Sequence, residues 1–198
     1  ASGAGVVLCP STEANLGDGL ADLPRWLAAG VPLALGSDSN VCRCWAEELR
    51  WLDYGQRLAH RRRNVAALPA RHEGATAARL FERVRAGGAA AAGLPRWGLQ
   101  RGARADLLVL DPRSPGLLGL PPSHALDGLV FATDAPALRE VWVAGQRVVA
   151  EGRPQKYPGA ENGWPSSAEP TACPSRSSRL PPASAGKASW ATVVTSTG

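Results

Sequence analysis

The stretch Val31-Pro32-Leu33-Ala34-Leu35-Gly36-Ser37-Asp38-Ser39-Asn40 decides the fold class of this chain. Its apolar run at 33–35 is too short for a helix and lies between a proline and a glycine, so it predicts a short buried strand. Asp38 follows the end of that strand. Parallel α/β sheets and barrels carry their chemical groups at this end of their strands, which makes Asp38 the first candidate for a functional residue.

The polar residues 37–40 also suit the start of a helix. Ser, Asp and Asn side chains accept hydrogen bonds from the free N–H groups of a first helical turn. Judged on spacing alone, helix capping is the more common role for Asp38, and a catalytic or metal-binding role is the rarer one. Both interpretations stay open on these residues by themselves.

The pattern around this stretch predicts a parallel α/β arrangement. Strands are expected at 5–8 and 32–35, and helices at 20–29, starting near Asp22, and at 44–59. The order strand, helix, strand, helix is the repeating unit of a parallel sheet covered by helices. Two such units cannot close a barrel, which takes eight units and about 250 residues.

Three local features give more detailed expectations. Residues 11–19 are polar and contain glycines, so a loop is expected after the first strand. An alanine-rich helix is expected at 75–93, interrupted at Gly87-Gly88. The helix over 44–59 is expected to bury one face, made of Trp45, Leu49, Leu52 and Gln56. Its outward face is expected to carry Glu47, Glu48, Arg50 and Arg57.

The character of the chain changes after residue 95, and residues 1–95 and 96–153 are interpreted as two different units. Within the second unit, 102–112 predicts a turn, a strand and a stop. Residues 138–149 alternate in two short runs around Ala144-Gly145, which is typical of a β-hairpin. Residues 154–198 hold seven prolines and eight serines without periodicity, so a disordered tail is predicted there.

The composition favours a soluble protein, cytoplasmic by default, over a nucleic-acid or membrane protein. The chain of 198 residues is 44% hydrophobic, with a net charge of +5, and it has no apolar run of membrane-spanning length. The triplet Arg61-Arg62-Arg63 follows a helix, where cations interact favourably with the helix dipole, and no aromatic residues alternate with it. The four cysteines lack zinc-site spacing, and the absence of methionine suggests a fragment without its N-terminal part.

Two segments resemble the metal-dependent amidohydrolase superfamily. Gly36-Ser37-Asp38 is similar to the last barrel strand of those enzymes, and the strands at 102–111 and 141–149 are similar to those that return to their small β-sandwich domain. Within the superfamily, the phrases at 9–19 and 47–58 resemble the deiminases that act on N-formimidoyl-L-glutamate in histidine degradation. The resemblance covers roughly residues 5–153.

The resemblance implies an α/β fold, namely the last two βα units of a (β/α)8 barrel followed by strands of a small β-sandwich domain. It implies one divalent metal, usually zinc, and hydrolysis of the formimino C=N bond to give N-formyl-L-glutamate and ammonia. Asp38 matches the aspartate of the last barrel strand, which ligates the metal and accepts a proton from the attacking water. Ser39 and Asn40 then remain the cap candidates, and the parent protein is expected to be a homodimer.

The chain supplies little else of such a metal site. The superfamily's His-x-His motif is absent, and His60, His72 and His124 have no metal-like spacing and are expected at the surface or in loops. Zinc sites use three or more protein ligands, so this chain alone is expected to be inactive. The alternatives are another deaminase of the superfamily, acting on a purine or pyrimidine ring, or a non-catalytic remnant.

Three polar residues follow the first strand at the same edge. Glu13, Asn15 and Asp18 either line the site or close a turn of the Asx type, and the turn is favoured.

Overall fold

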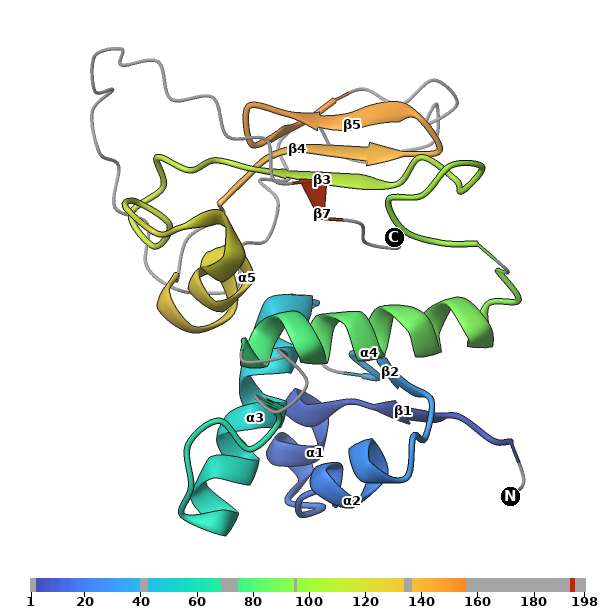
Figure 1. Ribbon diagram of the computed structural model, residues 1–198, viewed down its shortest axis with the longest axis vertical. Helices are drawn as coiled ribbons and strands as arrows, with labels where there is room; N and C mark the ends of the chain where they lie inside the picture. The colour runs from blue at the N-terminus through green and yellow to red at the C-terminus, as the bar shows by residue number, and fades with distance from the viewer. Residues whose placement is uncertain are drawn as a thin grey trace.

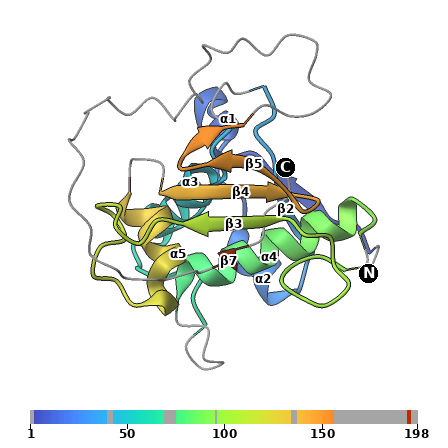
Figure 2. The same cartoon turned by 90° about the horizontal axis from the view of Figure 1, so that it is seen from above.

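The computed structural model describes residues 3–39, 43–68, 75–94, 96–133, 137–155 and 193–194. The architecture is mixed α/β. Two parallel strands with their helices form one end of the molecule, and an antiparallel sheet forms the other (Figure 1). Helix α4 (Thr76–Ala91) lies between them in this view, and in the view from above it is seen uncovered, running past the β3 side of the antiparallel sheet (Figure 2).

The predicted parallel strand pair is confirmed. Strand β1 (Val6–Leu8) runs parallel to β2 (Leu33–Leu35), with Leu8 opposite Leu35. Helix α2 (Leu23–Ala28) connects them and begins after Asp22, whose side chain accepts a hydrogen bond from the Arg25 N–H. Helix α3 (Trp45–His60) follows β2, close to the predicted bounds of 44–59.

The expectation of a loop at 11–19 is wrong, because most of this segment is helix α1 (Pro10–Leu16). Pro10 occupies the first turn, where its missing N–H is not needed. The Glu13 carboxylate accepts a hydrogen bond from the Cys9 N–H at 2.8 Å, which satisfies a donor at the helix start. Gly17 ends the helix with φ +76°, a conformation that glycine adopts without strain.

The expected outward face of α3 is also partly wrong. Glu48 is buried, with only 3% of its surface exposed, and both of its carboxylate oxygens are bonded to Ser11. Arg50 lies against the 128–133 segment, where its guanidinium donates to the carbonyl oxygens of Val130 and Thr133. The predicted inner face is confirmed at Leu49, Leu52 and Gln56, which are buried, whereas Trp45 is only partly buried against the core.

Gly87-Gly88 does not interrupt α4, which runs through both residues. A Cβ atom on Gly87 would lie 1.9 Å from the Leu33 carbonyl oxygen, so the backbone of α4 rests directly on β2 at this point. The glycine is explained by this close approach between helix and strand and not by a helix break.

The second half of the chain forms an antiparallel sheet in the order β6-β5-β4-β3-β7. The strands are β3 (Leu107–Leu110), β4 (Leu138–Val143), β5 (Gln146–Ala150), β6 (Arg153–Pro154) and β7 (Val193–Val194). The hairpin predicted at Ala144-Gly145 is confirmed, and both residues have positive φ, as a type I′ turn requires. Short helical segments precede β4, namely η2 (Pro122–His124), α5 (Ala125–Asp127) and η3 (Gly128–Ala132).

The predicted disordered tail at 154–198 falls mostly on residues outside the described ranges. The exceptions are Pro154 and Gln155 at its start, and Val193–Val194, which pair with β3 as β7.

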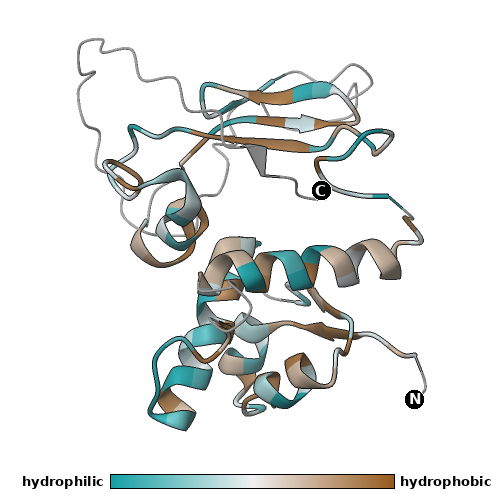
Figure 3. Ribbon diagram, viewed as in Figure 1, coloured by the Kyte–Doolittle hydropathy of each residue, from teal (hydrophilic) through white to brown (hydrophobic). Residues whose placement is uncertain are grey.

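One hydrophobic core joins the two halves. It includes Leu8 and Leu33 of the parallel pair, Leu49 and Leu80 of the long helices, and Leu108 of the antiparallel sheet. Figure 3 shows β1 and β3 in the colours of hydrophobic residues, whereas α3 alternates along its length. None of the helices in the described ranges has the combination of length and hydrophobicity needed to cross a bilayer.

Candidate functional site

Asp38 lies at the carboxyl edge of the parallel strand pair. The Gly36 N–H donates to the Leu8 carbonyl oxygen at 2.9 Å, so pairing with β1 extends one residue beyond β2. The chain then turns, and Asp38 adopts φ +46°, a left-handed conformation that aspartate tolerates better than most residues. Its side chain is exposed. The structure therefore has Asp38 at the strand edge where the sequence predicted a functional carboxylate.

The capping interpretation of this segment is not supported. Helix α3 begins at Trp45, with Cys44 as its N-cap residue and no capping bond from that side chain. Ser37, Asp38 and Ser39 precede no helix in the described part of this loop, and Asn40 lies outside the described residues.

Cys9 and Gly36 bring the two strand ends close together. A Cβ on Gly36 would lie 3.1 Å from the Cys9 sulfur, so a larger residue would push against that thiol. Burial raises the pKa of the Cys9 thiol, and the negative charges of Asp38, Glu13 and Glu48 raise it further, whereas a hydrogen bond with the Gly36 backbone lowers it. The net effect keeps Cys9 in its neutral form at neutral pH.

Helix α1 connects this edge to α3. The Thr12 hydroxyl donates to the Ser37 carbonyl oxygen at 2.8 Å, one residue before Asp38. The Ser11 N–H donates to Glu48 Oε2 at 2.9 Å, and the Ser11 hydroxyl donates to Glu48 Oε1. Ser11 and Glu48 are buried, so their two hydrogen bonds lie away from solvent, whereas the bond from Thr12 to Ser37 is partly buried.

The sequence analysis did not predict this hydrogen-bond network, although the sequence contains signals for it. Pro10 followed three residues later by Glu13 is a common start of a helix. Glu48 lies three residues after Trp45 and four before Leu52, which is the spacing of the buried face of α3. Its charge suggested the outward face, but helical periodicity alone predicts the inner one.

The other polar residues at this edge have simpler roles. Glu13 accepts the Cys9 N–H and so caps α1, whereas Asn15 and Asp18 are exposed. The Asx-type turn favoured for these residues is absent, because the segment is helical up to Leu16. His60 and His124 are exposed, as expected, and His72 lies outside the described residues.

These residues do not make a metal site by themselves. Among the residues that the structure describes, no group of three or more His, Cys, Asp or Glu side chains could hold an ion. Asp38 is the carboxylate best placed to serve as one ligand, because it is exposed at the strand edge, whereas both oxygens of Glu48 are already occupied. A complete site needs ligands beyond this set.

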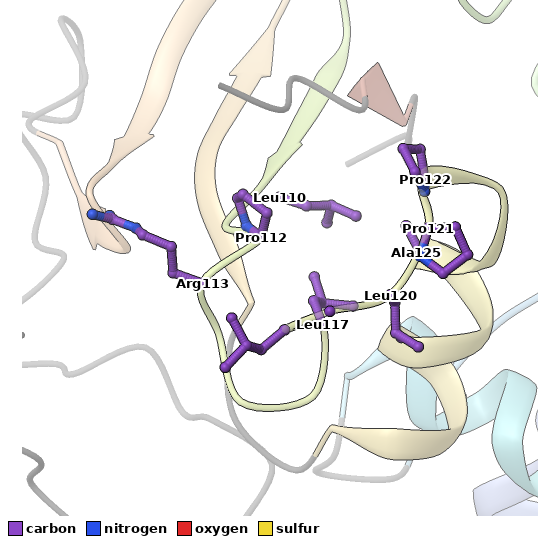
Figure 4. Close-up of a pocket in the computed structure, with 10 residues that line it drawn as sticks. Leu110, Pro112, Arg113, Leu117, Leu120, Pro121, Pro122 and Ala125 are labelled. Carbon is purple, nitrogen blue, oxygen red and sulfur yellow. The ribbon is translucent and has the colours of Figure 1, made fainter. Parts of the chain in front are cut away.

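A separate pocket of about 510 Å³ lies at the antiparallel sheet, beyond the end of β3 (Figure 4). Leu110, Leu117, Leu120 and Pro121 point into it, and Arg113 lies at its edge with its guanidinium ion-paired to Asp111. Its lining is apolar and offers no nucleophile or general base. The chemistry is therefore expected at the Asp38 edge and not in this pocket.

Comparisons with known proteins find similar sequences over most of this chain. A formimidoylglutamate deiminase from Pseudomonas aeruginosa is 46% identical over 152 residues, which cover 77% of this chain and 33% of that protein. A 5-methylthioadenosine/S-adenosylhomocysteine deaminase from Haloquadratum walsbyi is 36% identical over 134 residues, covering 66% of this chain and 28% of that protein. The chain spans about a third of the length of the curated relatives it matches.

Solved structures also match most of this chain. An amidohydrolase from Brucella melitensis superposes with a TM-score of 0.68 at 44% identity, covering 77% of this chain and 33% of that one. An adenosine deaminase from Xanthomonas campestris, solved with bound zinc, superposes with a TM-score of 0.65 at 23% identity and shows the same fold over 78% of this chain and 34% of its own. The amidohydrolase family matches residues 1–148 of this chain, and the chain therefore belongs to that family.

Proposed function

We propose that the protein to which this chain belongs hydrolyses N-formimidoyl-L-glutamate to N-formyl-L-glutamate and ammonia. The observation that carries the proposal is the 46% identity to a formimidoylglutamate deiminase over 152 residues, against 36% over 134 residues for a deaminase of 5-methylthioadenosine and S-adenosylhomocysteine. In this proposal, residues 1–95 are the last two βα units of a (β/α)8 barrel, and 96–153 are closing strands of a small β-sandwich domain.

The reaction adds water across the formimino C=N bond and then breaks the bond to the terminal nitrogen. Both protons of the water end on the departing nitrogen: the first as water adds, and the second, from the hydroxyl of the adduct, as the nitrogen leaves as ammonia and the formyl C=O forms. A carboxylate at the reacting carbon can accept the first proton and return it to the nitrogen. Asp38 fits this role because it is exposed at the strand edge and its charge is not used in an ion pair among the described contacts.

Two solved structures of the same fold contain zinc, and we infer that the complete site holds one divalent ion. Such an ion lowers the pKa of water towards 7 when it is bound. Asp38 would supply one ligand from this chain, and the described residues do not provide the others. We therefore expect this chain by itself to be inactive, and deiminase turnover by the isolated chain would contradict the proposal.

The test measures ammonia release by the complete protein from N-formimidoyl-L-glutamate, 5-methylthioadenosine and S-adenosylhomocysteine in parallel. Turnover of the formimino compound with the highest kcat/KM supports the proposal. A preference for either nucleoside would instead place the protein with the ring deaminases.

The role of Asp38 is tested with Asp38→Asn, which keeps the shape of the side chain and removes its charge. The loss of a proton acceptor should lower kcat by at least about a hundredfold. Asp111→Asn is the matched control, because Asp111 also follows directly after a strand but lies in the other sheet, bonded to Arg113. Asp38→Asn with full activity would exclude Asp38 from the chemistry.

A further inference from the structure

Glu48 is a buried carboxylate whose hydrogen bonds, among the residues that the structure describes, both come from Ser11. It lies in the first turns of α3 with 3% of its surface exposed, and its two oxygens accept the N–H and the hydroxyl of Ser11. A charge removed from water is costly unless hydrogen bonds compensate for it. Here both bonds come from the first turn of α1, whose free N–H groups also favour a negative charge. Glu48 therefore fixes the start of α1 to α3.

The next residue of α1 connects this anchor to the loop of Asp38. The buried Thr12 hydroxyl donates to the Ser37 carbonyl oxygen at 2.8 Å. Beyond Gly36, whose N–H bonds to Leu8, the strand ladder no longer holds this loop. Thr12 thus supplies a contact to the backbone just where it turns into the left-handed conformation of Asp38, with φ +46°.

We infer that Glu48 is a positioning residue for Asp38, acting through Ser11, Thr12 and the Ser37 carbonyl group. The inference rests on the proposed function, since it takes Asp38 as the reacting carboxylate. A buried anchor on a long helix sets the position of α1, and α1 sets the direction in which the Asp38 carboxylate leaves the strand edge. Neither Glu48 nor Thr12 touches the substrate in this arrangement.

Each hydrogen bond of this network can be tested with a variant that removes one of its groups. Thr12→Val removes the hydroxyl and keeps the branched shape, whereas Thr12→Ser keeps the hydroxyl. Glu48→Gln keeps the size but replaces one acceptor oxygen with an NH₂ group facing the two donors of Ser11. Glu82→Gln is the control, because Glu82 is an exposed carboxylate on α4, paired with Arg85.

Two measurements on the complete protein separate the inference from the proposed function. The first is kcat and KM for N-formimidoyl-L-glutamate. Thr12→Val and Glu48→Gln should lower kcat about tenfold to a hundredfold with little change in KM, because a displacement of about 1 Å can have effects of this size. The second is hydrogen exchange of the peptide that contains 36–39, which needs no substrate. Exchange there should become faster in both variants, but not in Thr12→Ser or Glu82→Gln.

The outcomes are distinct. Faster exchange with a loss of kcat that Thr12→Ser does not share supports the inference. Unchanged exchange in Thr12→Val and Glu48→Gln overturns it, and so does a kcat loss that Thr12→Ser shows equally. If the wild-type protein does not turn over the formimino compound, the proposed function fails, and hydrogen exchange alone then decides whether Glu48 and Thr12 hold the Asp38 loop.

Discussion

The neighbouring glycines Gly87 and Gly88 should respond in opposite ways to the same substitution. Both lie inside α4, where replacing glycine with alanine normally stabilises a helix by about 1 kcal/mol. A Cβ on Gly88 would meet only Trp97 Cζ3, at 4.0 Å, which is an ordinary contact. We therefore expect Gly88→Ala to raise the free energy of unfolding by about 0.5–1 kcal/mol.

At Gly87 the structure leaves no room for the methyl group. The added Cβ would lie 1.9 Å from the carbonyl oxygen of Leu33 and 2.7 Å from its nitrogen, and these are backbone atoms in a buried strand that cannot turn aside. Helix α4 would have to move away from β2 by about 1.5 Å to restore normal contact distances, and contacts along the helix would be lost. Overpacking of this kind costs about 1–3 kcal/mol or more, so Gly87→Ala should be destabilising by about 2 kcal/mol despite its better helix propensity.

The assay is urea unfolding of the wild type and both variants, followed by circular dichroism. The midpoint should rise for Gly88→Ala and fall for Gly87→Ala. Because β2 leads into Asp38, Gly87→Ala should also reduce the proposed deiminase activity of the complete protein. Equal midpoints for the two variants would refute the direct contact between α4 and β2.

Three further predictions follow from single residues. Asp53 is fully buried, and burial raises its carboxyl pKa more than its ion pair with Arg57 lowers it, so the folded state holds its proton to a higher pH than the unfolded state does. Its contribution to stability should therefore fall as the pH rises from the ordinary carboxyl pKa through the raised one, and Asp53→Asn should flatten this part of a stability–pH curve measured by thermal unfolding. Ala144→Asn should stabilise the hairpin by about 1 kcal/mol, since Ala144 has φ +50° and Asn-Gly is the preferred type I′ pair, which the unfolding midpoint would show. Alkylation of Cys9 by iodoacetamide should be slow at neutral pH, because its pKa is raised, and faster in Asp38→Asn, which removes one of the charges that raise it; equal rates in the two proteins would mean that Asp38 does not act on this thiol.

Several features of this protein could be predicted from local sequence because they depend on the residues' own preferences. The apolar run that ends at Gly36 makes a strand, and Asp38 follows at its carboxyl edge. The pair Ala144-Gly145 makes a hairpin because glycine favours the positive φ that the turn requires. These elements have the predicted bounds to within a residue or two.

The errors at Glu48 and Gly87 share a physical cause, which is contact between segments far apart in the sequence. Glu48 was expected in solvent, but a helix that begins 35 residues or more before it supplies two donors for its carboxylate, and burial then becomes tolerable. Gly87 resembled a helix breaker, and only the packing of α4 on β2 shows that the missing side chain makes room for a strand.

The sequence by itself determined the strand that carries Asp38 and the edge at which that carboxylate lies, because periodicity and turn preference are local properties. The tertiary structure alone decided what holds the Asp38 loop in place. The hydrogen bonds from Ser11 to Glu48 and from Thr12 to Ser37 join α1, α3 and the Asp38 loop, and no local preference of any one of these segments specifies the others.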